Sequence, residues 1–193
     1  MTRTAFLGVF LCLAVPAAAQ AGPGFASSAE AFKAGVGACQ RSFEGLKTQK
    51  PFGSELPATA GFAETAEPAD AAGLESVDAD IDHRVIAKAA LPPGDAAVYV
   101  VAGAWRGNLP ACRVVAVRAP GAAALAKAMF EDKASGWTVK EPQARDAELG
   151  MLSTTYGRPF LDEIGVGATL SYADGAPKGS ITALSSFTLA RDR

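Results

Sequence analysis

Few residues of this chain combine the type and the spacing that chemistry requires. Cys112 stands at the start of an apolar run, directly after a turn, and Cys39 is the only other cysteine besides Cys12 near the N-terminus. A thiol in such a place acts as a nucleophile, as a metal ligand or as half of a disulfide. A catalytic thiol needs a base, and two cysteines with one histidine fall short of four zinc ligands. We therefore predict a disulfide between Cys39 and Cys112.

The only histidine, His83, follows aspartates at alternate positions, which are Asp78, Asp80 and Asp82. Alternate carboxylates can converge on a calcium ion, but a calcium loop needs glycine where His83 stands and glutamate where Ala89 stands. We interpret the segment as a solvated strand entry and predict no metal and no cofactor. The chain has neither a Gly-x-Ser-x-Gly nor a Ser-x-x-Lys motif, so we predict no catalytic residue.

Four residues are candidates for contact with a partner, which the sequence does not identify as a protein or a small molecule. Trp105, Arg106 and Asn108 share the turn that precedes Cys112, and Arg158 stands between a glycine and a proline. Tryptophan and arginine are enriched in binding hot spots, and a turn can present them together. The alternative is that Trp105 folds onto the end of the sheet while the arginine is solvated.

Cys39 must be positioned by a helix. Ser27 and Glu30 have the spacing of a capping box, which predicts that a helix begins near residue 28 and continues to about residue 47. Apolar residues then recur at steps of four and three, which places them on one stripe of the helix. The stripe consists of Phe32, Val36, Cys39, Phe43 and Leu46. Cys39 is therefore expected to face the core.

Cys112 must be positioned by a strand. Two apolar runs, 97–104 and 111–117, are separated by six residues rich in turn formers, which predicts an antiparallel hairpin. On the second strand Cys112, Val114 and Ala116 share one face. A helix packed on that face brings Cys39 to Cys112.

The remaining patterns predict an α+β fold with an antiparallel sheet of about five or six strands, covered on one face by the N-terminal helix and a middle helix. The middle helix is expected over 120–135, and residues 48–75 are expected to form a long loop rich in proline, alanine and glycine. The other strands are expected over 80–91, 137–139, 149–156, 166–172 and 181–189.

Residues 1–19 have the pattern of a cleaved signal peptide, with one basic residue, an apolar core and small residues before the cleavage point. Cleavage is expected after Ala19 or Ala21, which leaves residues 20–193 as a single domain without a transmembrane segment. A cysteine pair in an exported chain favours a disulfide. The expected location is the bacterial periplasm or the medium.

The 18 basic and 20 acidic residues give a net charge of −2. Nucleic acid is not expected as a partner, because it requires a basic face. The sequence thus predicts an exported, disulfide-stabilised, non-catalytic binding or accessory protein of the cell envelope. The alternative is a small periplasmic enzyme, similar to a hydrolase, with a site based on carboxylates or assisted by His83.

Overall fold

The computed structural model describes residues 24–54, 56, 59–65, 81–105, 109–146, 150–161, 163–173 and 181–191, except for the side chains of residues 81–84, 105, 146 and 191. The leader predicted over residues 1–19, together with both candidate cleavage points, lies outside the described residues. Within the described part of the chain, no helix combines the length and the apolar character needed to cross a bilayer.

The described residues form helices and eight strands. The helical elements are α1 (Ser28–Leu46), α3 (Ala122–Glu131) and the short 3-10 helix η1 (Lys133–Ser135). The strands are β1 (Phe62–Glu64), β2 (Ile81–Ala89), β3 (Ala97–Trp105), β4 (Leu109–Val117), β5 (Thr138–Asp146), β6 (Met151–Leu161), β7 (Ile164–Ala173) and β8 (Ile181–Arg191). Both predicted helices and the two predicted hairpins are present.

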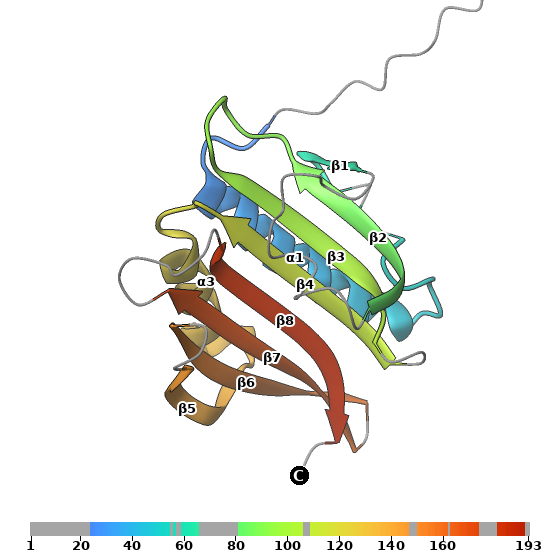
Figure 1. The fold of residues 1–193 in the computed structure, drawn as a ribbon. Helices are drawn as coiled ribbons and strands as arrows, with labels where there is room; N and C mark the ends of the chain where they lie inside the picture. The colour runs from blue at the N-terminus through green and yellow to red at the C-terminus, as the bar shows by residue number, and fades with distance from the viewer. Residues whose placement is uncertain are drawn as a thin grey trace, which may run out of the picture.

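The strands make one antiparallel sheet in the order β1-β2-β3-β4-β8-β7-β6-β5 (Figure 1). The chain builds this sheet in two runs of four strands. The run β1–β4 leads from one edge to the centre and the run β5–β8 leads from the other edge to the centre, so that β4 and β8 pair there. Each run also follows a helix, because α1 precedes β1–β4 and α3 precedes β5–β8. We call these parts the N-terminal half (residues 24–117) and the C-terminal half (residues 122–191), joined by residues 118–121.

The α+β class is confirmed, whereas the prediction of five or six strands is too low. β1 has only three residues and lies inside the segment predicted to be a loop, 48–75. The sequence predicts strand only over 137–139 in the region of β5, yet β5 continues to residue 146. Its side chains from 138 to 145 are all exposed, so the strand has no alternation of apolar and polar residues that would reveal it.

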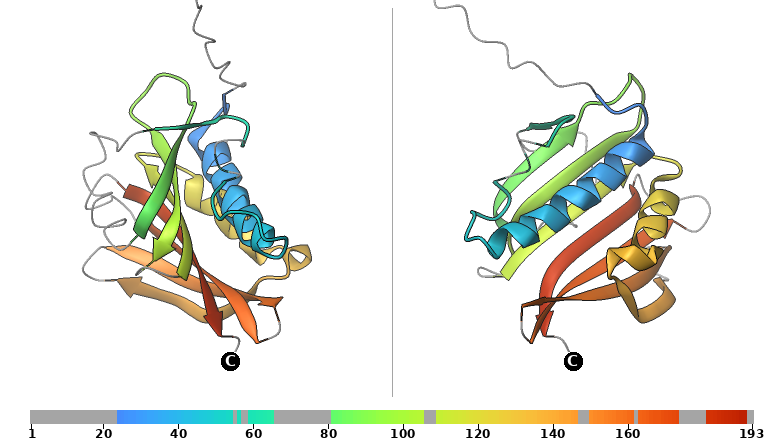
Figure 2. Two further views of the ribbon diagram at one scale, coloured as in Figure 1. Left: turned by 90° about the vertical axis from the view of Figure 1, so that its right-hand side faces the viewer. Right: turned by 180° about the vertical axis from the view of Figure 1, so that it is seen from behind.

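Both helices cover the same face of the sheet, as the view from behind in Figure 2 shows. The capping prediction for α1 is confirmed at its first turn, because the Ser27 hydroxyl accepts a hydrogen bond from the Glu30 backbone N–H at 3.2 Å. The predicted stripe of α1 faces the sheet, and Phe32, Val36 and Phe43 are fully buried there. The hydrophobic core therefore lies between the helices and this face of the sheet.

The central hairpin is longer than predicted. β3 continues to Trp105 and β4 begins at Leu109, and these two residues pair, so only residues 106–108 separate the strands. The six-residue loop of the prediction is therefore wrong. The turn formers asparagine and proline suggested a wider loop, but proline at position 110 fits within the strand, opposite Ala104.

Candidate functional site

The predicted crosslink is confirmed. Cys39 of α1 and Cys112 of β4 form a disulfide, with their Cα atoms 5.5 Å apart, and both side chains are fully buried. A disulfide without contact to solvent is held by packing on every side and offers no surface for exchange with another thiol. The cysteines that looked most reactive in the sequence therefore anchor α1 to the sheet.

The turn predicted to contact a partner lies mostly outside the described residues. Trp105 is the last residue of β3, but its side chain is outside them, as are Arg106 and Asn108. Its neighbour across the hairpin, Leu109, is described and is 44% exposed. Partner contact at this turn therefore stays a prediction.

Arg158 of β6 lies in internal contacts. Its guanidinium donates a hydrogen bond to the Glu44 carboxylate of α1 at 2.7 Å and lies over the Trp137 ring, 5.0 Å from the ring centre. Only 19% of the Arg158 side chain is exposed. These contacts connect the end of α1 to the C-terminal half, and contact of Arg158 with a partner stays a prediction.

His83 lies in β2, but its side chain is outside the described residues, and so are Asp78 and Asp80. The enzyme alternative that uses His83 therefore stays a prediction. Among the side chains that are described, no three from histidine, cysteine, aspartate and glutamate gather closely enough to hold a metal ion.

A cavity of about 400 Å³ lies where the chain crosses from one half to the other. The connection between β4 and α3 forms one wall, and the end of β7 with the beginning of β8 forms the other. Its lining includes Arg118, Pro120, Ala123, Tyr172, Ala173 and Thr182. The volume falls within the range of sites that bind small molecules.

Thr182 fixes the wall that carries Arg118. Its hydroxyl accepts a hydrogen bond from the Ala119 N–H at 3.0 Å and lies 3.2 Å from the Ala116 carbonyl oxygen, to which it can donate. The connection to α3 is thus tied to β8 at Ala119, the residue that follows Arg118. Gly121 then begins the helix with a φ of 76°, a value that glycine adopts without strain.

The backbone of Arg118 is itself unusual, because its φ is 48°, in the left-handed region. A residue with a side chain enters this region at a steric cost, which surrounding contacts must offset. Here the Thr182 hydrogen bonds hold the turn in place. As a result the Arg118 side chain stands at the cavity on a backbone with little freedom.

The opposite wall carries Tyr172 of β7. Its hydroxyl donates a hydrogen bond to the side-chain oxygen of Gln143 in β5 at 2.8 Å, which fixes the position of the ring. The cavity therefore combines a guanidinium, a phenol and a threonine hydroxyl with small apolar side chains. A few polar groups among apolar side chains are typical of a binding site.

No motif in the sequence predicts this cavity. Arg118 precedes Pro120 and Gly121, a pattern that predicts only a turn followed by a helix. The hydrogen bond from Ala119 to Thr182 joins residues 63 positions apart. The only indication of the cavity in the sequence is that a strand ends at a tight turn directly before a helix begins.

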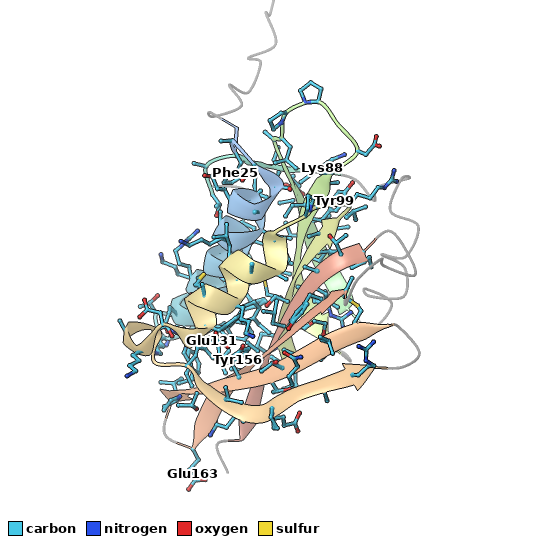
Figure 3. All side chains as sticks on the ribbon, turned by 90° about the vertical axis from the view of Figure 1, so that its left-hand side faces the viewer. Phe25, Lys88, Tyr99, Glu131, Tyr156 and Glu163 are labelled. Carbon is cyan, nitrogen blue, oxygen red and sulfur yellow. A yellow bond between two sulfur atoms is a disulfide. The ribbon has the colours of Figure 1, made fainter. Side chains whose placement is uncertain are left out.

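Among the described residues, the shifted pKa belongs to a different cluster. Tyr156 of β6 stacks on Phe130 of α3, with ring centres 4.7 Å apart, and lies near Glu131 (Figure 3). Burial raises the pKa of the Tyr156 phenol, and the negative charge of Glu131 raises it further. The Thr154 hydroxyl lowers the pKa. Tyr156 therefore stays neutral in the core and has no catalytic geometry.

The chain was compared with protein families, curated proteins and solved structures. No family model, curated protein or solved structure matches it. The candidate site is therefore defined by the cavity and by the residues that line it.

Proposed function

We propose that this protein is an exported, disulfide-stabilised binding or accessory protein of the bacterial cell envelope without catalytic activity, and that it binds a small molecule in the cavity at the junction of its halves. The predicted leader and the buried disulfide support export, because such bonds persist in oxidising compartments.

The observation that carries the binding function is the composition of the cavity. The Arg118 guanidinium stands among apolar walls formed by Ala119, Pro120, Ala123 and Ala173, beside Tyr172 and Thr182, whose hydroxyl groups are held by internal hydrogen bonds. Ligand sites commonly have this mixture of a few placed polar groups and a mainly apolar surface. Because the wall that carries Arg118 is tied to β8, the site is formed before a ligand arrives, which lowers the entropy lost on binding.

Binding by strand addition has less support, because both edges of the sheet are poor templates. β1 has only three residues. β5 carries Pro142, shifts its register twice and exposes charged side chains. Proline, bulges and charge are the features by which edge strands avoid pairing with other chains.

A thermal shift screen of small polar molecules tests the proposal. The blocking variant is Ala123→Phe, which fills the cavity, and its matched control is Ala124→Phe, the next residue of α3, which is exposed and does not line the cavity. A compound at about a hundred times its Kd adds about 2.7 kcal/mol to the free energy of unfolding, enough for a rise of several degrees in Tm.

We expect at least one compound to raise the Tm of the wild type and of Ala124→Phe, but not that of Ala123→Phe. The proposal is contradicted if no compound raises the Tm, or if the blocking variant responds as the wild type does. Turnover of a substrate that is lost in His83→Ala with unchanged melting would favour the enzyme alternative instead.

A further inference from the structure

We propose that the ligand of this cavity is a small amphiphilic acid, whose carboxylate or phosphate group binds the Arg118 guanidinium and whose short apolar body lies against the alanine and proline walls. This inference rests on the proposed function, because it names the chemical class of the ligand for the same cavity.

The charge of the cavity favours an acidic ligand. Arg118 is the only charged residue among the described residues that line it. Within the described part of the chain, no carboxylate lies at ion-pair distance from the Arg118 guanidinium. A guanidinium keeps its charge under all physiological conditions and matches the two oxygens of a carboxylate or phosphate. The described lining of the cavity thus presents one positive charge.

The backbone conformation of Arg118 also favours a binding role for its side chain. A left-handed φ of 48° is unfavourable for arginine, whereas glycine or asparagine would occupy the same turn with less strain. The turn could therefore be made without this side chain. Strained residues of this kind concentrate at ligand-binding positions, where the surrounding structure holds them. The strain and the position at the cavity together favour a binding role for the guanidinium.

The other walls define the body of the ligand. Pro120, Ala123 and Ala173 present small apolar surfaces, and the Tyr172 ring is held by its hydrogen bond to Gln143. Since that hydrogen bond uses the phenolic proton, the ring serves chiefly as an apolar wall. A volume of about 400 Å³ accommodates a ring or a short chain next to the acid group.

The experiment compares acids with uncharged partners that carry the same aromatic ring. Benzoate is paired with benzamide, and phenyl phosphate with phenol, and each is titrated into the full chain by calorimetry at millimolar concentration. The first variant is Arg118→Asn, which removes the charge and tolerates the left-handed turn, so that it folds. Arg118→Lys keeps the charge but loses the planar fork. Arg41→Asn, at an exposed position of α1, is the control for a lost surface charge.

We expect at least one acid to bind about tenfold more tightly than its neutral partner, and we expect this preference to disappear in Arg118→Asn while Tm is unchanged or higher. Arg118→Lys should retain part of it, and Arg41→Asn all of it. A preference for benzoate over phenyl phosphate, or the reverse, identifies which acid group the site accepts.

Two results would overturn the inference. The first is that no acid binds better than its neutral partner, and the second is that Arg118→Asn keeps the preference. If neutral compounds from the thermal shift screen still bind and are blocked by Ala123→Phe, the proposed function stands and only the ligand class is wrong. If nothing binds and the screen is also negative, both fail.

Discussion

The two halves of the molecule share one order of connections but differ in how a helix is held on the sheet. In the N-terminal half, α1 lies so close to the sheet that a Cβ on Gly35 would stand 2.7 Å from a methyl carbon of Val114. The disulfide from Cys39 to Cys112 fixes that contact covalently. In the C-terminal half, α3 is held by aromatic rings around Phe130. Both helices bury aromatic side chains, but α1 adds a close approach at Gly35 and a crosslink, whereas α3 is held by the rings around Phe130 without one.

The faces of the sheet that point away from the helices differ as well. In the N-terminal half this face holds a second apolar cluster in which Tyr99, Val101 and Val115 are buried. In the C-terminal half it carries hydroxyl groups on β6 and β7, such as Ser153 and Ser171, whose oxygens lie 2.7 Å apart. The sheet is therefore apolar on both faces in the N-terminal half and on one face in the C-terminal half.

Removal of the disulfide is expected to cause the largest loss of stability. The double variant Cys39→Ala/Cys112→Ala removes a link between residues 73 positions apart, for which chain entropy predicts a loss of about 4 kcal/mol in the free energy of unfolding. Urea unfolding of the variant and of the oxidised wild type measures it. A loss below about 1 kcal/mol would mean that close packing alone holds α1, and the contrast between the halves would be weaker than described.

In the C-terminal half, the aromatic cluster around Phe130 holds the helix as the disulfide does in the N-terminal half. Phe130→Ala removes a ring that contacts Tyr156, Trp137 and Phe187, and we expect a loss of about 3 kcal/mol. The near-ultraviolet circular dichroism should also decrease, because these rings lose their fixed environment. Leu125→Ala, at a partly exposed position on the same helix, should cost less than about 1 kcal/mol. Equal losses in both variants would contradict a special role for the cluster.

The close approach of α1 predicts effects of opposite sign at two glycines of one helix. Gly35→Ala forces its methyl group onto the stiff side chains of Val114 and Val100, and we expect a loss of about 2 kcal/mol. At Gly37 the new methyl group meets only the flexible end of Arg41, so Gly37→Ala should gain about 0.5 kcal/mol from helix propensity. Chemical denaturation of the two variants gives the comparison. If both stabilise, α1 does not lie as close to the sheet as described.

The smallest effect concerns Tyr156. Because burial raises the pKa of its phenol above the ordinary value of 10.0, the stability contributed by the neutral phenol is present below pH 10.0 and is lost as the pH rises through the raised value. Tyr156→Phe should change stability by less than about 1 kcal/mol at neutral pH, since the phenol has no hydrogen-bond partner. Thermal melts from neutral to alkaline pH should show a shallower decline in the variant than in the wild type. Parallel declines would show that Tyr156 does not titrate with unfolding.

The sequence predicted the features that depend on local spacing. The apolar stripe of α1 and the alternation in β4 placed both cysteines on facing surfaces, and that was enough to predict the disulfide. The alternation of β7 and β8 predicted their antiparallel pairing for the same reason.

The features that depend on distant contacts were not predictable. β5 is recognised by its pairing with β6, because its own side chains are polar and exposed. The cavity depends on Thr182 meeting Ala119 and on the left-handed backbone of Arg118. No periodicity in the sequence encodes either contact, since each follows from how the two halves come together.

The most direct test of the proposed function is amide NMR of the labelled wild-type protein, titrated with the compound that raises its Tm most in the screen. We predict that the largest chemical shift changes fall on residues 118–123, 172–173 and 182, on both sides of the junction between the halves. Changes centred on the hydroxyl-bearing face of β6 and β7, or changes absent from residues 118–123, would contradict the proposal that the ligand occupies this cavity.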